Sequence, residues 1–225
     1  MGDRPATAAR ARPGPAILEL VCCAVVDGRL AVLTERGRAA RGGTLPWSPL
    51  DPAGPLDASA ARWVRGLLGR APGWMTQLGA FSTGGRHPSG AALAVVYVAV
   101  VPPATEAPAG CTWSPAFEPP PLPPSRQWVL DAAVAGLRDR MDLAPIAFRM
   151  LPATFTLSEL QRIYELLLGR RLHKASFRRA LQAAFLVEPT DAWRSEGRGR
   201  PAQLYRYAPR KRRGVRRSVR FELLG

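Results

Sequence analysis

The chain has 225 residues, enough for one large domain or two small ones, and its hydrophobic fraction of 47% is sufficient for a packed core. No apolar run approaches the roughly 18 residues of a membrane-spanning helix, so the sequence predicts no membrane partner. The formal net charge is +15, of which residues 1–148 contribute +3 and residues 149–225 contribute +12. This division indicates two domains, and it predicts that the basic domain binds a polyanion.

Residues 1–15 are basic and rich in proline and alanine, and no cleavage signature follows them. We therefore expect a disordered leader rather than a signal peptide. Three cysteines follow, at Cys22, Cys23 and Cys111. Two are adjacent and none has the spacing of metal ligands, which predicts reduced thiols in a cytoplasmic protein. We expect the adjacent pair to pack as small hydrophobic side chains in a strand.

A β-hairpin is predicted near the start of the chain, with strands at Ile17–Val26 and Arg29–Thr34. Asp27 and Gly28 lie between them, and Asp-Gly favours the type I′ turn, which needs positive φ at both central positions. Further along, the Val-rich segment Ala91–Val101 predicts a buried strand that ends at two prolines.

Residues 45–69, LPWSPLDPAGPLDASAARWVRGLLG, resemble the Nudix box. Its pattern is Gly, five residues, Glu, seven residues, Arg-Glu, an apolar residue, any residue, Glu-Glu, any residue, Gly. An ungapped alignment places the Arg on Arg62, the apolar position on Val64 and the last Gly on Gly69. None of the other box residues is present: Ser48 replaces the first Gly, and the four Glu positions hold Gly54, Trp63, Gly66 and Leu67.

The resemblance implies a Nudix-like helix over residues 56–68, capped by Gly69, without the chemistry of the family. Nudix hydrolysis of a linked nucleoside diphosphate depends on box carboxylates that hold cations such as magnesium. Asp51 and Asp57 lie before or at the start of this helix and cannot replace them. We therefore expect no catalytic residue, no metal and no cofactor. We also expect Trp63 and Leu67 to be covered by a ligand, the linker or a second subunit, or to pack in the core.

Between the two predicted units lies a proline-rich stretch, residues 102–124, which predicts a linker without regular structure. A helix is predicted over Gln127–Met141 because apolar residues recur at helical spacing. Its buried face is expected to hold Leu130, Val134, Leu137 and Met141.

The C-terminal region predicts two helices joined by a tight turn. Thr156 and Glu159 form a capping box, and Gly169 ends the first helix. The second helix, residues 174–185, has a core face of Phe177, Leu181, Ala184 and Phe185. Its opposite face presents Arg179 and Gln182, with Arg178 on the flank and Lys174 at the start. Such residues contact phosphates and base edges in helix-turn-helix proteins, which predicts double-stranded DNA as the partner.

A wing is predicted after the second helix. It consists of a short strand at Leu186–Glu188, an Arg/Gly hairpin over residues 194–200, and a returning strand at Gln203–Tyr207. Arg198 and Arg200 in the hairpin are expected to contact the DNA backbone. An RNA-binding protein is an alternative, but aromatic residues exposed on a sheet would be expected for it, and most aromatic residues here have core spacing.

Three segments in order resemble the winged helix domain of the Nudix-related transcriptional regulators of NAD metabolism. They are FTLSELQ, FRR and GRPAQLYRY, at residues 155–161, 177–179 and 199–207. That family also has an N-terminal Nudix-like domain, so the resemblance covers residues 17–209. It implies an α/β Nudix-like sandwich followed by a winged helix-turn-helix domain. The expected division is a leader (1–15), a Nudix-like domain with linker (16–124), a connecting helix (125–149), a winged helix (150–209) and a basic tail (210–225).

The resemblance further implies a cytoplasmic bacterial repressor or activator that forms a homodimer and binds operator DNA. Its Nudix-like domain would sense a nucleotide such as ADP-ribose or NAD. Positions that are rich in Asp in the family hold Ser82, Thr83, Gly84 and Gly85 here, which leaves the nucleotide open. The alternative is a Nudix hydrolase of ADP-ribose-like substrates with a basic tail, which the missing glutamates disfavour.

Overall fold

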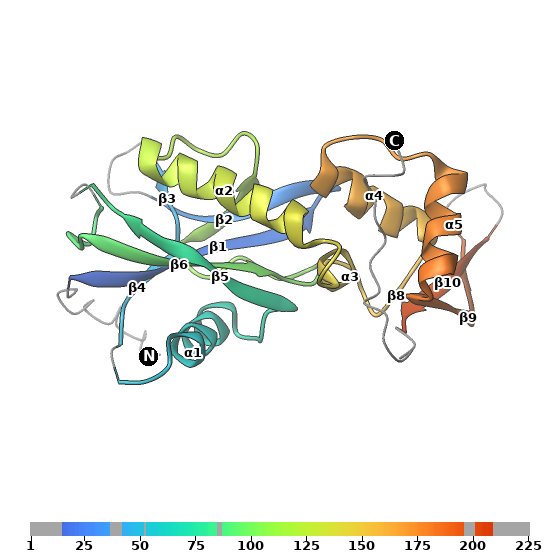
Figure 1. The fold of residues 1–225 in the computed structure, drawn as a ribbon, viewed down its shortest axis with the longest axis horizontal. Coiled ribbons are helices and arrows are strands. Elements are labelled where there is room, and N and C mark those ends of the chain that lie inside the picture. The colour runs from blue at the N-terminus through green and yellow to red at the C-terminus, as the bar shows by residue number, and fades with distance from the viewer. Residues whose placement is uncertain (1–14, 37–41, 52, 85–86, 196–200, 209–225) are drawn as a thin grey trace, which may run out of the picture.

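The computed structural model describes residues 15–36, 42–51, 53–84, 87–195 and 201–208. Most of the expected leader and the whole of the expected basic tail, 210–225, lie outside these ranges. Figure 1 shows a sheet with a helix on each face, followed by a smaller helical unit with a sheet of its own. In the part of the chain that the structure describes, no helix is long and apolar enough to cross a membrane.

The first unit is a mixed seven-stranded sheet. The strand order is β3-β2-β1-β6-β5, with β4 paired to β1 and β7 paired to β2. Strands β1 and β6 are parallel, and the other pairs are antiparallel. The elements are β1 (Ala16–Val26), β2 (Arg29–Arg36), β3 (Gly43–Thr44), β4 (Trp47–Pro49), α1 (Leu56–Leu68), β5 (Trp74–Ser82), β6 (Leu93–Val100), β7 (Cys111–Pro115) and α2 (Pro124–Arg140).

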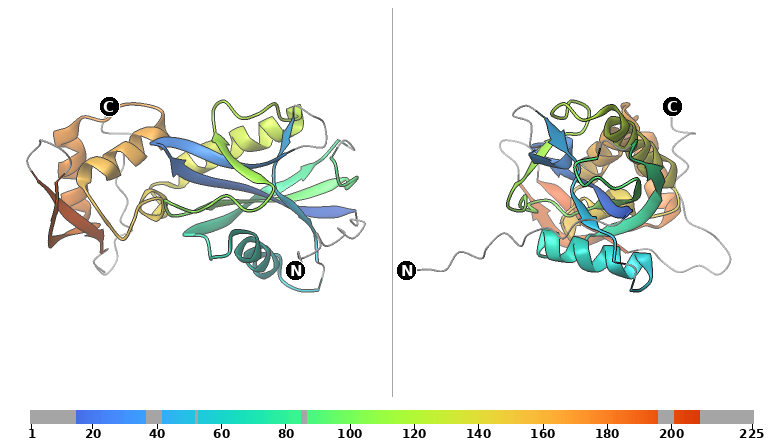
Figure 2. Two further views of the ribbon diagram at one scale, coloured as in Figure 1. Left: turned by 180° about the vertical axis from the view of Figure 1, so that it is seen from behind. Right: turned by 90° about the vertical axis from the view of Figure 1, so that its left-hand side faces the viewer.

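The sheet is apolar on both faces because a helix covers each of them (Figures 1 and 2). Alternate residues of β1 therefore enter two separate cores, since strand side chains point to opposite faces in turn. Val21 and Cys23 join the core that includes α2, whereas Leu20 and Cys22 join the core beneath α1. Burial raises the pKa of the Cys23 thiol to about 12, so this cysteine behaves as a small hydrophobic residue, as predicted.

The predicted hairpin and box helix are confirmed. Asp27 and Gly28 have φ of 48° and 70°, the positive values that a type I′ turn requires. The box helix α1 spans Leu56–Leu68, and Gly69 closes it in the left-handed conformation at φ 66°. Helix α2 begins at Pro124, earlier than predicted, because proline is tolerated in the first turn of a helix. All four residues of its predicted apolar face are buried.

Four strands of the sheet, the short β3 and β4 together with β5 and β7, were not expected. Strand β7 lies within the proline-rich stretch that was predicted to lack regular structure, so that prediction is wrong for Cys111–Pro115. The strand forms because β2 supplies its hydrogen-bond partners, and the hydroxyls of Thr34 and Ser114 lie 2.9 Å apart across the pair. Strand β5 has a mixed sequence, and its pairing with β6 is interrupted by an irregularity between Gln77 and Gly79.

The second unit is a helix-turn-helix followed by a three-stranded sheet of order β8-β10-β9. The predicted capping box is confirmed: the Glu159 N–H donates to the Thr156 hydroxyl at 3.1 Å, and the Thr156 N–H donates to the Glu159 carboxylate at 2.7 Å. The elements are α3 (Ile146–Arg149), β8 (Thr154–Phe155), α4 (Leu157–Leu168), α5 (Lys174–Ala184), β9 (Val187–Arg194) and β10 (Ala202–Tyr207).

Two predictions for this unit need correction. Phe185 was expected on the core face of the second helix, but its side chain is 47% exposed. The helix ends at Ala184, and Phe185 adopts φ 50° as its cap, which turns the side chain away from the core. The first wing strand was expected to end at Glu188, but β9 continues to Arg194 because β10 pairs along most of it.

The two units share one hydrophobic core that continues through α3. Phe148 is the central aromatic side chain of this junction, with its ring centroid 4.5 Å from that of Tyr207 and 5.9 Å from that of Phe155. Arg138 of α2 donates to the carbonyl of Leu167 in α4 at 2.5 Å. The junction is therefore packed with side chains from both units, and the helix-turn-helix lies against one end of the large sheet (Figure 2).

Candidate nucleic-acid interface

The turn between α4 and α5 is held by two polar side chains of α4. The Glu165 carboxylate accepts a hydrogen bond from the backbone N–H of Leu172 at 2.9 Å and from the amide of Gln161 at 3.0 Å. The same amide donates to the carbonyl of Leu172 at 2.9 Å. The turn therefore has a fixed geometry that sets the start of α5. Sequence reasoning did not identify Glu165, because its partners lie beyond the helix that carries it.

Burial pushes the pKa of Glu165 upward, but the hydrogen bonds from Leu172 and Gln161 and the nearby Arg171 guanidinium outweigh this effect. Its pKa therefore lies below the ordinary value. The carboxylate is accordingly ionised at neutral pH and accepts charge-assisted hydrogen bonds, which are stronger than neutral ones.

Helix α5 buries one face and exposes the other, as its sequence predicted. Phe177 and Leu181 are fully buried, and the Phe177 ring lies 5.5 Å from the ring of Tyr164 in an edge-to-face contact. The predicted outward side chains are all exposed: Lys174, Arg178, Arg179 and Gln182. The helix therefore exposes three cations and an amide to solvent, with Arg179 and Gln182 on the side opposite Phe177 and Leu181.

The wing is attached to α4 by an ion pair. Arg194, at the end of β9, donates to the Glu159 carboxylate at 2.7 Å and approaches the carbonyl of Thr154 at 3.5 Å. Arg194 therefore faces the helices. Its neighbour Trp193 is 58% exposed on the wing, a feature that sequence reasoning missed. Arg198 and Arg200, the predicted wing contacts, lie outside the described residues.

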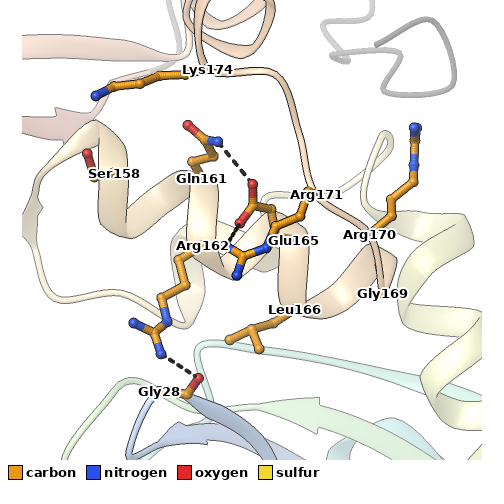
Figure 3. A pocket seen from close by; sticks show the side chains of 10 residues that line it. All are labelled: Gly28, Ser158, Gln161, Arg162, Glu165, Leu166, Gly169, Arg170, Arg171 and Lys174. Atoms are coloured by element: carbon orange, nitrogen blue, oxygen red, sulfur yellow. Dashed lines mark hydrogen bonds and ion pairs between the residues drawn. The ribbon is translucent and has the colours of Figure 1, made fainter. Parts of the chain in front are cut away.

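A groove separates α4 from the β1–β2 hairpin turn, with a volume of about 630 Å³ (Figure 3). Arg162 crosses its floor and donates to the carbonyl of Gly28 at 3.3 Å. Lys174 and Ser158 line the side nearer the start of the two helices. The groove is thus formed by both units of the chain, which sequence reasoning did not anticipate.

The box residues are spread over the loop and helix that lead from β4 to β5. Ser48 lies in β4, Gly54 is exposed in the following loop, and Gly66 is exposed on α1. Trp63 and Leu67 are partly buried and pack against the core that contains Leu18 and Val64. Core packing within the chain, one of the coverings considered for these two side chains, is therefore present.

The carboxylates nearest to the box are engaged in other contacts. Asp57 accepts a hydrogen bond from the Tyr97 hydroxyl at 2.6 Å, and burial together with this bond raises the pKa of Tyr97. Asp51 accepts from the backbone N–H of Ala53 at 2.9 Å and lies 3.9 Å from Arg62. Within the described ranges, no three His, Cys, Asp or Glu side chains gather where they could hold a metal ion.

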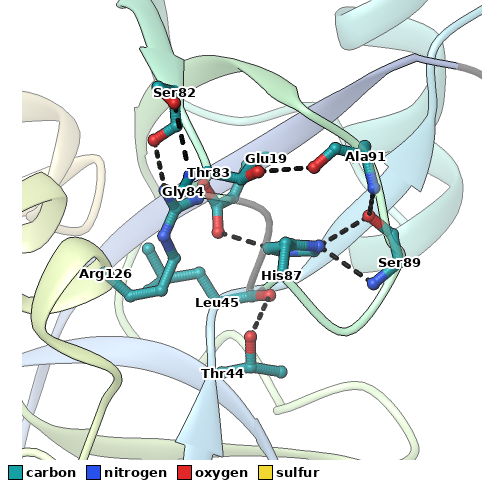
Figure 4. A network of polar contacts seen from close by, with 10 residues as sticks. All are labelled: Glu19, Thr44, Leu45, Ser82, Thr83, Gly84, His87, Ser89, Ala91 and Arg126. Atoms are coloured by element: carbon teal, nitrogen blue, oxygen red, sulfur yellow. Dashed lines mark hydrogen bonds and ion pairs between the residues drawn. The ribbon is translucent and has the colours of Figure 1, made fainter.

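A polar network is buried beneath α2 (Figure 4). Arg126 of α2 forms an ion pair with Glu19 of β1, and both side chains are almost completely buried. His87 lies on the other side of the carboxylate, with its Nε2 atom 3.6 Å from Glu19 Oε1. The backbone N–H of Ser89 donates to His87 Nδ1 at 3.1 Å. This network ties the β5–β6 connection, the sheet and α2 together.

Comparison with known proteins matches the C-terminal unit to a family. Residues 147–207 match the family described as the NrtR DNA-binding winged helix domain. The chain is 42% identical over 80 residues to the ADPR responsive transcriptional repressor NtrR of Acinetobacter baylyi. That match covers 36% of this chain and 32% of the repressor, so it spans about a third of the relative's length.

The fold agrees over most of the chain with a solved NrtR. Shewanella oneidensis NrtR in complex with a 27mer DNA superposes with a TM-score of 0.74 at 25% identity, covering 87% of this chain and 94% of that one. A MutT/nudix family protein from Enterococcus faecalis shares the fold, with a TM-score of 0.68 at 16% identity, covering 88% of this chain and 89% of that one. The fold is thus a Nudix-like domain followed by a winged helix domain, as in the solved NrtR, and residues 147–207 match the NrtR winged helix family.

Proposed function

We propose that this chain is a DNA-binding transcriptional regulator whose winged helix binds operator DNA. In this proposal, residues 150–209 are the DNA-binding domain, and residues 125–149 connect it to a Nudix-like sensor over residues 16–124. The solved relative from Shewanella oneidensis binds a 27mer DNA, and the Acinetobacter relative is a transcriptional repressor. Both relatives support the assignment.

One observation carries the proposal: α5 exposes four groups suited to a DNA major groove. Arg179 and Gln182 lie opposite the buried Phe177 and Leu181, Arg178 lies on the flank, and Lys174 lies at the start of the helix. Arg179 and Gln182 are assigned to base edges, because guanidinium and amide groups form paired hydrogen bonds with guanine and adenine. Lys174 and Arg178 are assigned to phosphates, which fix the register of the helix. In the wing, Arg198 and Arg200 are assigned to the DNA backbone.

The Nudix-like domain of this regulator is a nucleotide sensor without hydrolase activity. The Acinetobacter relative is responsive to ADP-ribose, which makes ADP-ribose the first effector to test and NAD the second. The absence of catalysis follows from the residues at the four glutamate positions, since Gly54, Trp63, Gly66 and Leu67 offer no oxygen ligand to magnesium from a side chain. The regulator acts as a homodimer in the cytoplasm, where its operator is found.

The test is selection of a preferred duplex from a random DNA pool by the full-length chain. We expect one sequence family to be enriched, with an affinity at least about 10³-fold above that for random duplex. ADP-ribose should then change the affinity for the selected duplex. Equal binding to random duplex and single-stranded RNA, with no enriched sequence, would refute the proposal. Magnesium-dependent turnover of ADP-ribose would favour the hydrolase alternative.

A further inference from the structure

The groove between α4 and the β1–β2 hairpin turn is strongly basic. It is lined by Arg162, Arg170, Arg171 and Lys174 and by one acidic side chain, Glu165, for a net charge of +3. Glu165 is already engaged by the backbone of Leu172 and by Gln161. The charge balance of the groove therefore favours an anionic occupant.

The groove adjoins the recognition surface of α5, which is formed by the exposed residues proposed to contact DNA: Lys174, Arg178, Arg179 and Gln182. Lys174 is the first residue of α5, so it belongs both to that surface and to the wall of the groove. Helix α4 is the first helix of the helix-turn-helix, the element that crosses the DNA backbone when the second helix occupies the major groove. Ser158 is exposed in the first turn of α4 and Arg162 is exposed one turn later, both on the side of the groove. Hydroxyl, guanidinium and ammonium donors therefore line the same groove, where a backbone would pass.

The residues that line the groove favour a DNA backbone over a free nucleotide as its occupant. A nucleotide site needs an apolar or aromatic surface for the base in addition to donors for the phosphates. Leu166 is the one large apolar side chain among the lining residues, and no aromatic side chain lines the groove in the described part of the chain. A phosphodiester backbone needs only the donors.

We propose that this groove holds the phosphate backbone of the operator beside the major groove that α5 enters, with Ser158, Arg162 and Lys174 as donors. The hairpin turn at Gly28 forms the opposite wall, so the Nudix-like domain contributes to the DNA interface as well as to sensing. Arg162 is the central residue, because it extends across the groove between the two units. The inference rests on the proposed function and adds a contact surface to it.

The primary test compares Arg162→Gln with Arg65→Gln in the full-length chain. Both variants remove one exposed positive charge, but Arg65 lies on α1, at the far face of the sheet (Figure 1). We expect Arg162→Gln to weaken binding to selected and random duplexes by the same factor, about eightfold at 0.1 M salt. The slope of log affinity against log salt concentration should become shallower by about one. Arg65→Gln should change neither the duplex affinity nor its salt dependence. Arg162→Lys should restore the slope, since it keeps the charge.

A second pair of variants separates charge from structure. Ser158 is the second residue of α4, where an acidic side chain stabilises the helix N-terminus. We therefore expect Ser158→Glu to fold normally and to weaken binding of both duplexes, whereas Ser158→Gln should bind nearly as well as the parent. A purely structural role of Arg162 would lower the melting temperature without changing the salt slope.

Three outcomes would overturn the inference. The first is an unchanged salt slope in Arg162→Gln while Arg178→Ala/Arg179→Ala abolishes duplex binding, which would leave the proposed function intact. The second is normal duplex binding by Ser158→Glu. The third is a loss of ADP-ribose affinity in Arg162→Gln, measured by calorimetry, with duplex binding unaffected, which would make the groove a nucleotide site. Failure of α5 variants to affect binding would instead contradict the proposed function itself.

Discussion

Arg194 and Glu159 form an ion pair of 2.7 Å that joins the wing to the capping box of α4. The same carboxylate accepts the backbone N–H of Thr156 through its other oxygen. One side chain therefore stabilises the start of the first helix and fixes the base of the wing. Two elements that meet the DNA in the proposed function thus share a single anchoring group.

Replacement of Arg194 with Ala should lower the free energy of unfolding by about 0.5–1 kcal/mol, since the pair is about one-third exposed and solvent screens it. Urea denaturation of the full-length chain measures the change. Arg206→Ala serves as the control, because Arg206 is more exposed than Arg194 and its 3.2 Å pair with Glu188 is longer, so it should contribute less. Equal losses in the two variants would contradict an anchoring role for Arg194.

Replacement of Arg126 with Met should be the most destabilising single change in the Nudix-like domain. It would leave the Glu19 carboxylate buried beneath α2 without its cationic partner, and breaking a buried pair on one side costs about 3–5 kcal/mol. The matched control is Arg62→Met, whose pair with Asp51 lies at the surface. Thermal and urea unfolding should show a large loss for the first variant and almost none for the second.

Glu165 should make the helix-turn-helix sensitive to acid. Its pKa is lowered in the folded chain, so its contribution to stability is fully present above the ordinary value of 4.5 and is lost as the pH falls below that value. In Glu165→Gln the same stabilisation is missing at neutral pH. The stability difference between parent and variant should therefore be largest near neutral pH and shrink below about pH 4.5. A difference that stays constant from pH 7 to pH 3 would contradict this assignment.

Variants of helix α5 should distinguish the residues that recognise bases from those that contact phosphates. Gln182→Ala or Arg179→Ala is expected to reduce discrimination between selected and random duplex by about 1–3 kcal/mol, because each would remove a base contact. Lys174→Ala and Arg178→Ala should weaken both duplexes alike and flatten the salt dependence. Anisotropy titrations at several salt concentrations distinguish the two classes. Unchanged binding in Arg178→Ala/Arg179→Ala, with residues 210–225 deleted, would refute the recognition-helix assignment.

The purified chain should not hydrolyse ADP-ribose in the presence of magnesium. The positions of the box glutamates hold no carboxylate, and the Asp57 carboxylate accepts a hydrogen bond from the Tyr97 hydroxyl. Product formation by chromatography, compared with a reaction without protein and a reaction with chelator, provides the measurement. Turnover that exceeds both controls would show that other residues supply the metal site.

Local interactions explain which elements the sequence predicted correctly. The hairpin turn depends on Asp27 and Gly28 alone, and the start of α4 depends on Thr156 and Glu159, three residues apart. The end of α1 follows from Gly69, which closes the helix in the left-handed conformation. In each case the interacting groups lie within a few residues, so the pattern in the sequence carries the physical cause.

Contacts between distant segments were decided only by the tertiary structure. Strand β7 exists because β2 pairs with it, and the hydroxyls of Thr34 and Ser114 that face each other are 80 residues apart. Arg162 and Gly28, separated by 134 residues, form the basic groove. The sequence pattern did not single out Arg162. Its place between the two units depends on the shared core around Phe148, which sets how the helix-turn-helix packs against the sheet.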